Sequence, residues 1–250
     1  MTQKSILIIG AGIAGLSAGC YAQMNGFRSK IVEMHDLPGG LCTAWERKAY
    51  TFDGCIHYLF GTGKGQPFNT MWQELGALQG RPVVDQDEYI RISDGQQVLT
   101  VYTDPDRLQE HMLSFSPQDA HLIKPFIRGV RHFQKFDLSM LQVKPRALMT
   151  PQDWAAMGKA VLPYTLDMAK WGAISMGEFA RQFKHPFLRR AVAQMFSWDE
   201  APAMMGMCLL AYMHNHNAGF PTGASLEFAR AIERRYLALG GEIEYKAQVE

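Results

Sequence analysis

A glycine-rich turn near the amino terminus constrains the fold of this chain more than any other feature. The turn follows the apolar residues 6–9 and precedes a segment with helical spacing, and it consists of Gly10, Ala11, Gly12, Ile13, Ala14 and Gly15. Glycine at these spacings allows a tight turn, lets a diphosphate approach the backbone and lets the helix pack closely on the strand. We therefore predict a strand at 5–9, a helix at about 14–24 and a second strand at 30–33.

An acidic residue completes this pattern, because Glu33 ends the second strand about twenty residues after the turn. Its carboxylate is placed to accept hydrogen bonds from ribose hydroxyls, and its charge disfavours a 2′-phosphate. The unpaired N–H groups at the start of the helix would bind the phosphates. The pattern predicts a dinucleotide site, the alternative being a glycine turn without a ligand. The unbroken apolar run at 6–9 favours a parallel strand covered on both faces.

The middle of the chain has a different pattern. Residues 89–92 and 98–102 alternate on either side of a Ser-Asp-Gly turn and predict an antiparallel hairpin. Proline and glycine then separate four expected helices, at 119–136, 151–168, 176–183 and 186–196. Ser225 is the expected N-cap of a last helix that ends at Gly240, and a strand at 242–245 would return the chain to the first sheet.

Composition narrows the function classes. The 250 residues carry a net charge of +1, which argues against a nucleic-acid partner. The four cysteines lack metal-ligand spacing, so we expect no metal site, no disulfide scaffold and a cytoplasmic location. His214 and His216 fall on different faces of a helix and do not form a metal pair. The methionine-rich residues 201–213 are too short to span a membrane and form either an apolar substrate tunnel or, more simply, a buried core helix.

Two further segments resemble a known family. A glycine pair at 39–40 follows the acidic residue, and Phe-Asp-Gly-Cys-Ile-His-Tyr occupies 52–58. These features resemble the amine oxidase-type flavoprotein superfamily, and in particular its phytoene desaturases, carotenoid isomerases and retinol saturases. The resemblance implies FAD as cofactor. It further implies that the cofactor contacts include Met34, Gly39, Gly40, Leu41, Gly54, Ile56 and His57. His57 would lie beside the flavin, either as a catalytic proton donor or as a hydrogen-bond partner that shapes the site.

The carboxyl-terminal segment carries the same resemblance. Residues 220–224 resemble the family's Tyr-Pro-x-Gly-Gly turn, and 240–249 resemble the strand that meets the adenine, which implies a contact at Val249. The implied fold is α/β, a Rossmann-like FAD-binding domain (GR2-type) with an inserted α+β, mostly helical, substrate domain. The first part of the FAD-binding domain would occupy 1–80, the substrate domain 81–217 and the return 218–250. Family members are about twice as long, so the resemblance implies a missing C-terminal half or a second chain.

The resemblance implies an FAD-dependent oxidoreductase that acts on an apolar polyene or isoprenoid by flavin hydride transfer, in desaturation, saturation or isomerisation. It is also compatible with a peripheral membrane contact. Two alternatives remain open. One is a non-catalytic dinucleotide-binding fragment or split-protein half. The other is an NAD-dependent dehydrogenase, which the glycine pair and the Phe-Asp-Gly segment argue against.

Overall fold

The computed structural model describes residues 4–137, 144–196 and 198–250, which form two compact units. One unit contains residues 1–84 and 219–250, and the other contains 85–218. The elements of the first unit are β1 (Ser5–Ile9), α1 (Ile13–Met24), β2 (Arg28–Glu33), β3 (Ala44–Arg47), β4 (Tyr50–Asp53), β5 (Leu59–Phe60), α2 (Pro67–Glu74), β6 (Val83–Val84), β9 (Ala218–Pro221), α10 (Ala224–Ala238) and β10 (Glu242–Tyr245).

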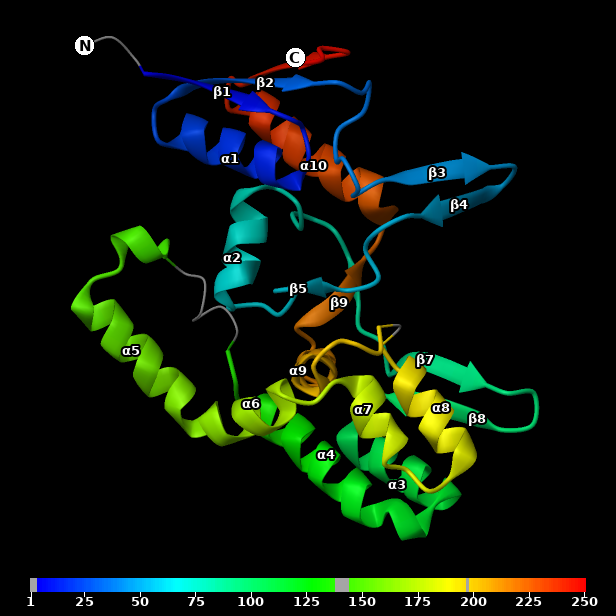
Figure 1. Cartoon of the computed structure of the whole chain (residues 1–250). Helices are drawn as coiled ribbons and strands as arrows, with labels where there is room; N and C mark the ends of the chain where they lie inside the picture. Colours follow the sequence, from blue (N-terminus) through cyan, green and yellow to red (C-terminus); the bar gives the residue numbers. More distant parts are fainter. Residues whose placement is uncertain (1–3, 138–143, 197) are drawn as a thin grey trace. The chain divides into compact units, whose positions relative to one another are not determined.

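A parallel sheet with the order β1-β2-β10 organises this unit. The predicted return of the chain to its first sheet is therefore confirmed. Helices α1 and α10 lie side by side against the sheet (Figure 1). A side chain at Gly19 of α1 would come within 2.7 Å of the Tyr236 ring of α10, so the small residue permits this close approach. Tyr236 is fully buried and donates a hydrogen bond to the carbonyl oxygen of Ser29 in β2 at 2.8 Å.

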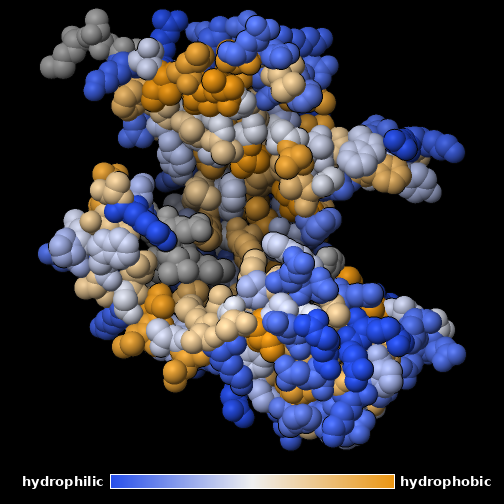
Figure 2. Space-filling model, in the orientation of Figure 1, coloured by the Kyte–Doolittle hydropathy of each residue, from blue (hydrophilic) through white to orange (hydrophobic). Residues whose placement is uncertain are grey.

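The prediction that β1 is covered on both faces is wrong for the part of the protein described. Strand β1 pairs with β2 alone within its sheet, and both helices pack on one side. Leu7 and Ile9 are therefore 65% and 69% exposed. Hydrophobic residues reach the surface over this part of the sheet (Figure 2). The apolar run correctly predicted a parallel strand, but it could not show which faces other elements cover.

The initiation of α10 also differs from the prediction. Ser225 is not its N-cap, because the helix begins at Ala224 and its N-cap is Gly223, whose φ is +98°. The cap comes instead from a distant segment, since Asp53 at the end of β4 accepts a hydrogen bond from the Ser225 backbone N–H at 3.1 Å. Asp53 also accepts a hydrogen bond from the Ser225 hydroxyl. This pair fixes the Phe-Asp-Gly segment to the start of α10.

The second unit is mostly helical. A hairpin precedes its helices, as the alternating pattern predicted. The predicted helix at 151–168 is broken after Val161, because Pro163 lies in a short 3₁₀ turn that separates two helices. The elements are β7 (Glu88–Ser93), β8 (Val98–Tyr102), α3 (Pro105–Phe115), α4 (Ala120–Phe133), α5 (Pro151–Val161), α6 (Thr165–Gly172), α7 (Met176–Arg181), α8 (Pro186–Gln194), α9 (Ala203–His214) and 3₁₀ turns at Pro117–Asp119, Arg146–Leu148 and Leu162–Tyr164.

Helix α9 contains the methionine-rich segment, and it lies in the core of the second unit. Met207 and Met213 are buried in α9, and the sulfur of Met207 packs against Gly129 of α4. The simpler of the two interpretations, a buried core helix, therefore holds for this segment. None of the helices in the described ranges is long and apolar enough to cross a membrane.

Candidate functional site

The glycine turn between β1 and α1 has the geometry that its sequence predicts. Gly10 adopts a φ of +96°, a conformation that side chains rarely allow, and its N–H donates to the carbonyl oxygen of Val32 at 2.8 Å. A Cβ at Gly15 would lie 2.0 Å from the carbonyl oxygen of Gly10. The turn and the first turn of α1 are therefore in direct contact, and glycine is required at both positions.

Gly12 is the N-cap of α1, and the space beside it is open. A Cβ added there would meet no atom within 4 Å. No side chain caps this helix end, and its first turn holds no acidic residue. The end of α1 thus keeps its partial positive charge and its backbone donors for a ligand.

A second glycine pair closes the other side of this turn. The Gly39 N–H donates to the carbonyl oxygen of Ala11 at 2.8 Å, and Gly39 forms an isolated parallel bridge with Gly12. A Cβ on Gly40 would lie 3.6 Å from the Gly12 Cα, so the two glycines face each other. Gly10, Gly12, Gly39 and Gly40 together form a cradle of bare backbone, which we call the glycine cradle. A phosphate group fits such a surface because no side chain keeps it away from the amides.

Glu33 lies beside the glycine cradle. It is buried, and its two carboxylate oxygens accept hydrogen bonds from the backbone N–H groups of Ala11 at 2.7 Å and His35 at 2.9 Å. Burial alone would raise the pKa of Glu33, but the His35 and Ala11 donors outweigh it and hold the pKa below its ordinary value. The residue is therefore ionised at neutral pH, and each oxygen keeps a lone pair for a further donor.

The carboxyl-terminal segment runs beside Glu33. The Lys246 N–H donates to the carbonyl oxygen of His35 at 3.0 Å, and the Ala247 N–H donates to that of Glu33 at 2.9 Å. Val249 follows two residues later and is exposed. The segment that contains Val249 therefore lies next to Glu33, and the contact of Val249 with the adenine stays a prediction.

The segment predicted to approach the flavin is held by a buried hydroxyl. The backbone N–H of Ile56 donates to the Ser225 hydroxyl oxygen at 2.8 Å, and Ile56 itself is buried. The Gly54 N–H donates to the carbonyl oxygen of Thr43 at 2.9 Å. His57 is exposed beside these anchored residues. The hydrogen bonds between Asp53 and Ser225 that fix this segment were not predicted from the sequence. The presence of an acidic residue, Asp53, in the Phe-Asp-Gly run was the one feature that could have indicated them.

The remaining predicted contacts are open to solvent. Met34 is exposed after Glu33, and Leu41 is 90% exposed directly after the glycine pair. Ile13 and Ala14 belong to the first turn of α1, so their backbone N–H groups lie at the same end of the helix as Gly12. The described residues include no group of three or more His, Cys, Asp or Glu side chains arranged to hold a metal ion.

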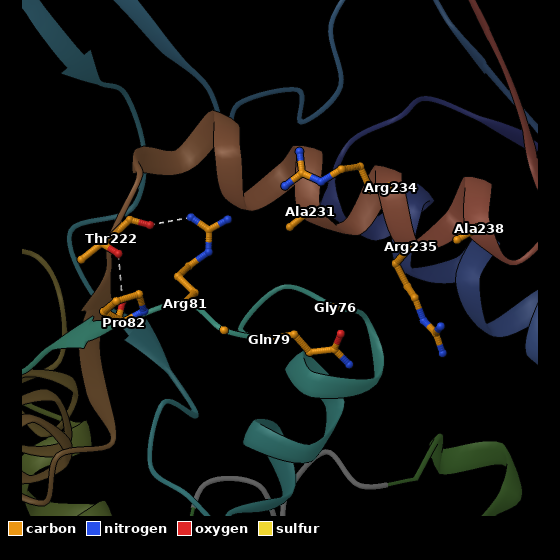
Figure 3. Close-up of a pocket in the computed structure, with 10 residues that line it drawn as sticks. Gly76, Gln79, Arg81, Pro82, Thr222, Ala231, Arg234, Arg235 and Ala238 are labelled. Carbon is orange, nitrogen blue, oxygen red and sulfur yellow. Dashed lines mark hydrogen bonds between the residues drawn. The ribbon is translucent and has the colours of Figure 1, made fainter.

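A pocket of about 560 Å³ lies on another side of this unit, between the loop at 76–82 and α10 (Figure 3). Arg81 lines it and donates to the backbone oxygens of Ala77, Thr222 and Glu227 at 3.1, 2.5 and 3.0 Å. Burial lowers the pKa of Arg81. These bonds fasten the loop to the start of α10, so Arg81 supports the anchor of the Phe-Asp-Gly segment, and none of the predicted cofactor contacts lines this pocket.

Comparison with known proteins agrees with this geometry. The family model described as an NAD(P)-binding Rossmann-like domain matches residues 8–75. A phytoene desaturase (lycopene-forming) of Pseudescherichia vulneris is 23% identical over 99% of this chain and 50% of its own length. A chloroplastic prolycopene isomerase of an Oncidium hybrid cultivar is 23% identical over 97% of this chain and 42% of its own. The chain thus spans about half the length of the curated relatives it matches.

A solved structure supports the fold. A putrescine oxidase variant, made in a redesign of cofactor binding, superposes with a TM-score of 0.55 at 13% identity and covers 99% of this chain and 52% of its own. The expected Rossmann-like α/β fold is confirmed, and the predictions of an oxidoreductase and of FAD as its cofactor agree with these relatives. The chain is similar to a phytoene desaturase and a prolycopene isomerase over almost its whole length, and its residues 8–75 match the model of an NAD(P)-binding Rossmann-like domain.

Proposed function

We propose that this chain is the nucleotide-binding half of an FAD-dependent oxidoreductase that acts on an apolar polyene or isoprenoid. The observation that carries the proposal is the glycine cradle with an ionised Glu33 at its side. The names of the relatives, a desaturase and an isomerase of carotenoid substrates, support the substrate class. Bound FAD supplies the acceptance or donation of a hydride, so the protein needs no nucleophile.

The residues of this chain would bind and orient the cofactor. The backbone N–H groups at the start of α1 point to where a diphosphate would lie, and the open space at Gly12 admits it. The Glu33 carboxylate would accept hydrogen bonds from the neighbouring ribose hydroxyls. Because Glu33 is ionised, a 2′-phosphate at the same place would be repelled, which selects against NADP-type ligands.

The Phe-Asp-Gly segment would form the wall at the flavin end. Its backbone is fixed by the Ser225 hydroxyl and the Asp53 carboxylate, so Gly54 and Ile56 hold a set position. His57 is exposed at that position and would be available to a ring or a substrate as a hydrogen-bond partner. Its proposed role is that of a proton donor or of a hydrogen-bond partner that shapes the flavin site, and neither role requires it to act as a nucleophile.

The experiment that tests this proposal is a titration of the purified chain with FAD and, separately, with NAD⁺ and NADP⁺. Quenching of flavin fluorescence would report FAD binding, and calorimetry would report the nicotinamide nucleotides. We expect FAD to bind more tightly than NADP⁺, and a Glu33→Gln variant to narrow that preference. Preference for NAD⁺ over FAD would contradict the proposal and favour a nicotinamide-dependent dehydrogenase.

A second experiment tests the substrate class. The FAD-loaded chain would be given a carotenoid polyene and a polar amine under anaerobic conditions, and flavin absorbance would be followed. We expect the polyene alone to change the flavin spectrum. A chain that binds FAD but changes with neither substrate would instead support the alternative of a non-catalytic dinucleotide-binding module.

A further inference from the structure

Two cysteines stand opposite each other at the open end of the hairpin formed by β3 and β4. The register of this hairpin continues beyond its strands, because the Gly54 N–H donates to the carbonyl oxygen of Thr43 at 2.9 Å. One step further in the same register, Cys42 is opposite Cys55. Opposite residues of an antiparallel pair place their side chains on the same face. The hairpin therefore brings together two thiols that are not neighbours in the chain.

The kind of pairing at this step suits a disulfide bond. Thr43 and Gly54 share a ladder hydrogen bond, and hydrogen-bonded and non-hydrogen-bonded pairs alternate along an antiparallel ladder. Cys42 and Cys55 thus occupy the place of a non-hydrogen-bonded pair, in which the Cα atoms lie about 4.5 Å apart. Disulfide bonds join Cα atoms that are about 4.4–6.8 Å apart. A bond between the two sulfurs therefore fits the fold of the hairpin.

The two thiols already interact, but their surroundings differ. Cys42 is buried, and its Sγ donates a hydrogen bond to the carbonyl oxygen of Ser225 at 3.3 Å. Burial raises the pKa of the Cys42 thiol to about 12, with a further contribution from the charge and the hydrogen bond of the neighbouring Cys55 thiol. Cys55 itself is exposed. A reagent in solution therefore meets Cys55 first, and Cys42 is the thiol placed to react next.

We propose that Cys42 and Cys55 form a redox-active dithiol, which a small disulfide such as glutathione disulfide oxidises to a reversible bond within the chain. The Cys55 thiolate attacks one sulfur of glutathione disulfide. The S–S bond of the oxidant breaks, and one glutathione leaves as a thiolate and takes up a proton. Cys42 then loses its proton to water as its sulfur attacks Cys55 in the mixed disulfide, and the second glutathione leaves and is protonated. Two protein thiols are oxidised to one disulfide, and the oxidant is reduced to two thiols.

The new bond would join the two segments that we assign to the cofactor. The Cys42 N–H donates to the carbonyl oxygen of Gly39 in the glycine cradle at 3.0 Å. Cys55 lies between Gly54 and Ile56 in the Phe-Asp-Gly segment. Oxidation would therefore link the cradle covalently to the wall at the flavin end. This consequence rests on the proposed function, whereas formation of the bond does not.

The test is oxidation of the folded, reduced 250-residue chain in glutathione buffers of rising disulfide content. Acid quenching, alkylation and peptide mapping by mass spectrometry would follow. We expect a peptide in which Cys42 is linked to Cys55, with two hydrogen atoms fewer than the dithiol, and its loss on addition of dithiothreitol. Because the bond closes a loop of roughly 15 residues, the oxidised chain should also unfold at a temperature higher by about 5 °C or more.

The other two cysteines are internal controls. Cys20 is buried in the first unit, where its Sγ donates to the carbonyl oxygen of Ile232 at 3.8 Å, and Cys208 is buried in α9 of the second unit. Both should remain thiols throughout the buffer series. The matched control variant is Cys208→Ser, which removes a buried thiol outside the hairpin and should form the bond as the unaltered chain does.

Two variants test the order of the steps. Cys42→Ser should stop at a glutathione adduct on Cys55, and Cys55→Ser should leave Cys42 unmodified over the same time. Modification of Cys42 at an undiminished rate in Cys55→Ser would overturn the inference. So would thiols that stay unchanged across the buffer series, or a lasting glutathione adduct or Cys55-linked dimer in place of the internal bond.

The linked peptide is measured in the unaltered chain, so the outcome does not depend on whether a variant folds. The assay needs neither FAD nor substrate. Its failure would therefore leave the proposed function standing, and a failure of FAD to bind would leave the dithiol standing.

Discussion

Replacement of Gly12 by aspartate should separate folding from cofactor binding. Gly12 has φ −67° and ψ 172° at the N-cap of α1, and a Cβ there meets no atom within 4 Å. Aspartate prefers this position over glycine by a few tenths of a kcal/mol, because its carboxylate accepts a hydrogen bond from the free N–H groups of the first turn. The free energy of unfolding should therefore stay constant or rise slightly in Gly12→Asp.

The affinity for FAD, in contrast, should fall in Gly12→Asp. The new carboxylate would occupy the glycine cradle where we place the diphosphate. Two unit charges about 4 Å apart repel by ~4 kcal/mol at the effective dielectric of a protein surface, or about a thousandfold in affinity. Thermal unfolding followed by circular dichroism would measure the first effect, and flavin fluorescence titration the second. Gly12→Ala, which adds volume without charge, is the matched control and should lose less affinity.

If Gly12→Asp folds normally and binds FAD as tightly as the unaltered chain, the diphosphate does not lie over the start of α1. If it binds weakly only because it unfolds, the open space at Gly12 has been misjudged.

Three further predictions follow from single contacts. Gly15→Ala should lower the free energy of unfolding by about 1–3 kcal/mol in denaturant titration, because its Cβ would lie 2.0 Å from the Gly10 oxygen; an unchanged midpoint would contradict this. The depressed pKa of Glu33 means that its stabilisation is present above its unfolded pKa and is lost as pH falls through the folded one, so Glu33→Gln should flatten the acid limb of stability against pH. Iodoacetamide at neutral pH should label exposed Cys55 and spare Cys42, since burial raises the pKa of the Cys42 thiol to about 12; mass spectrometry showing equal labelling would disprove it.

The parts of the fold that the sequence predicted depend on local physics. The tight turn at Gly10, the close contact at Gly15 and the acid at the end of β2 each follow from spacing within one βαβ unit. The hairpin of β7 and β8 likewise follows from alternation around a short turn. In such segments the residues that decide the structure are neighbours in the chain.

Two of the predictions that failed depend on contacts between residues far apart in the chain. Ser225 was expected to cap its own helix, but the cap comes from Asp53, which is 172 residues away. The exposed side of β1 depends on what packs over the sheet, which the apolar run does not encode. The break at Pro163 was foreseeable, because proline in a helix interior removes a hydrogen bond and disfavours a straight continuation.

We place a diphosphate over the backbone amides at the start of α1 and the adjoining ribose beside the Glu33 carboxylate. A crystal structure of the chain soaked with FAD would test it most directly. We expect phosphate density over the glycine cradle and ribose hydroxyls within hydrogen-bond distance of the Glu33 carboxylate. Ordered FAD bound anywhere else on the chain, with the cradle empty, would contradict it.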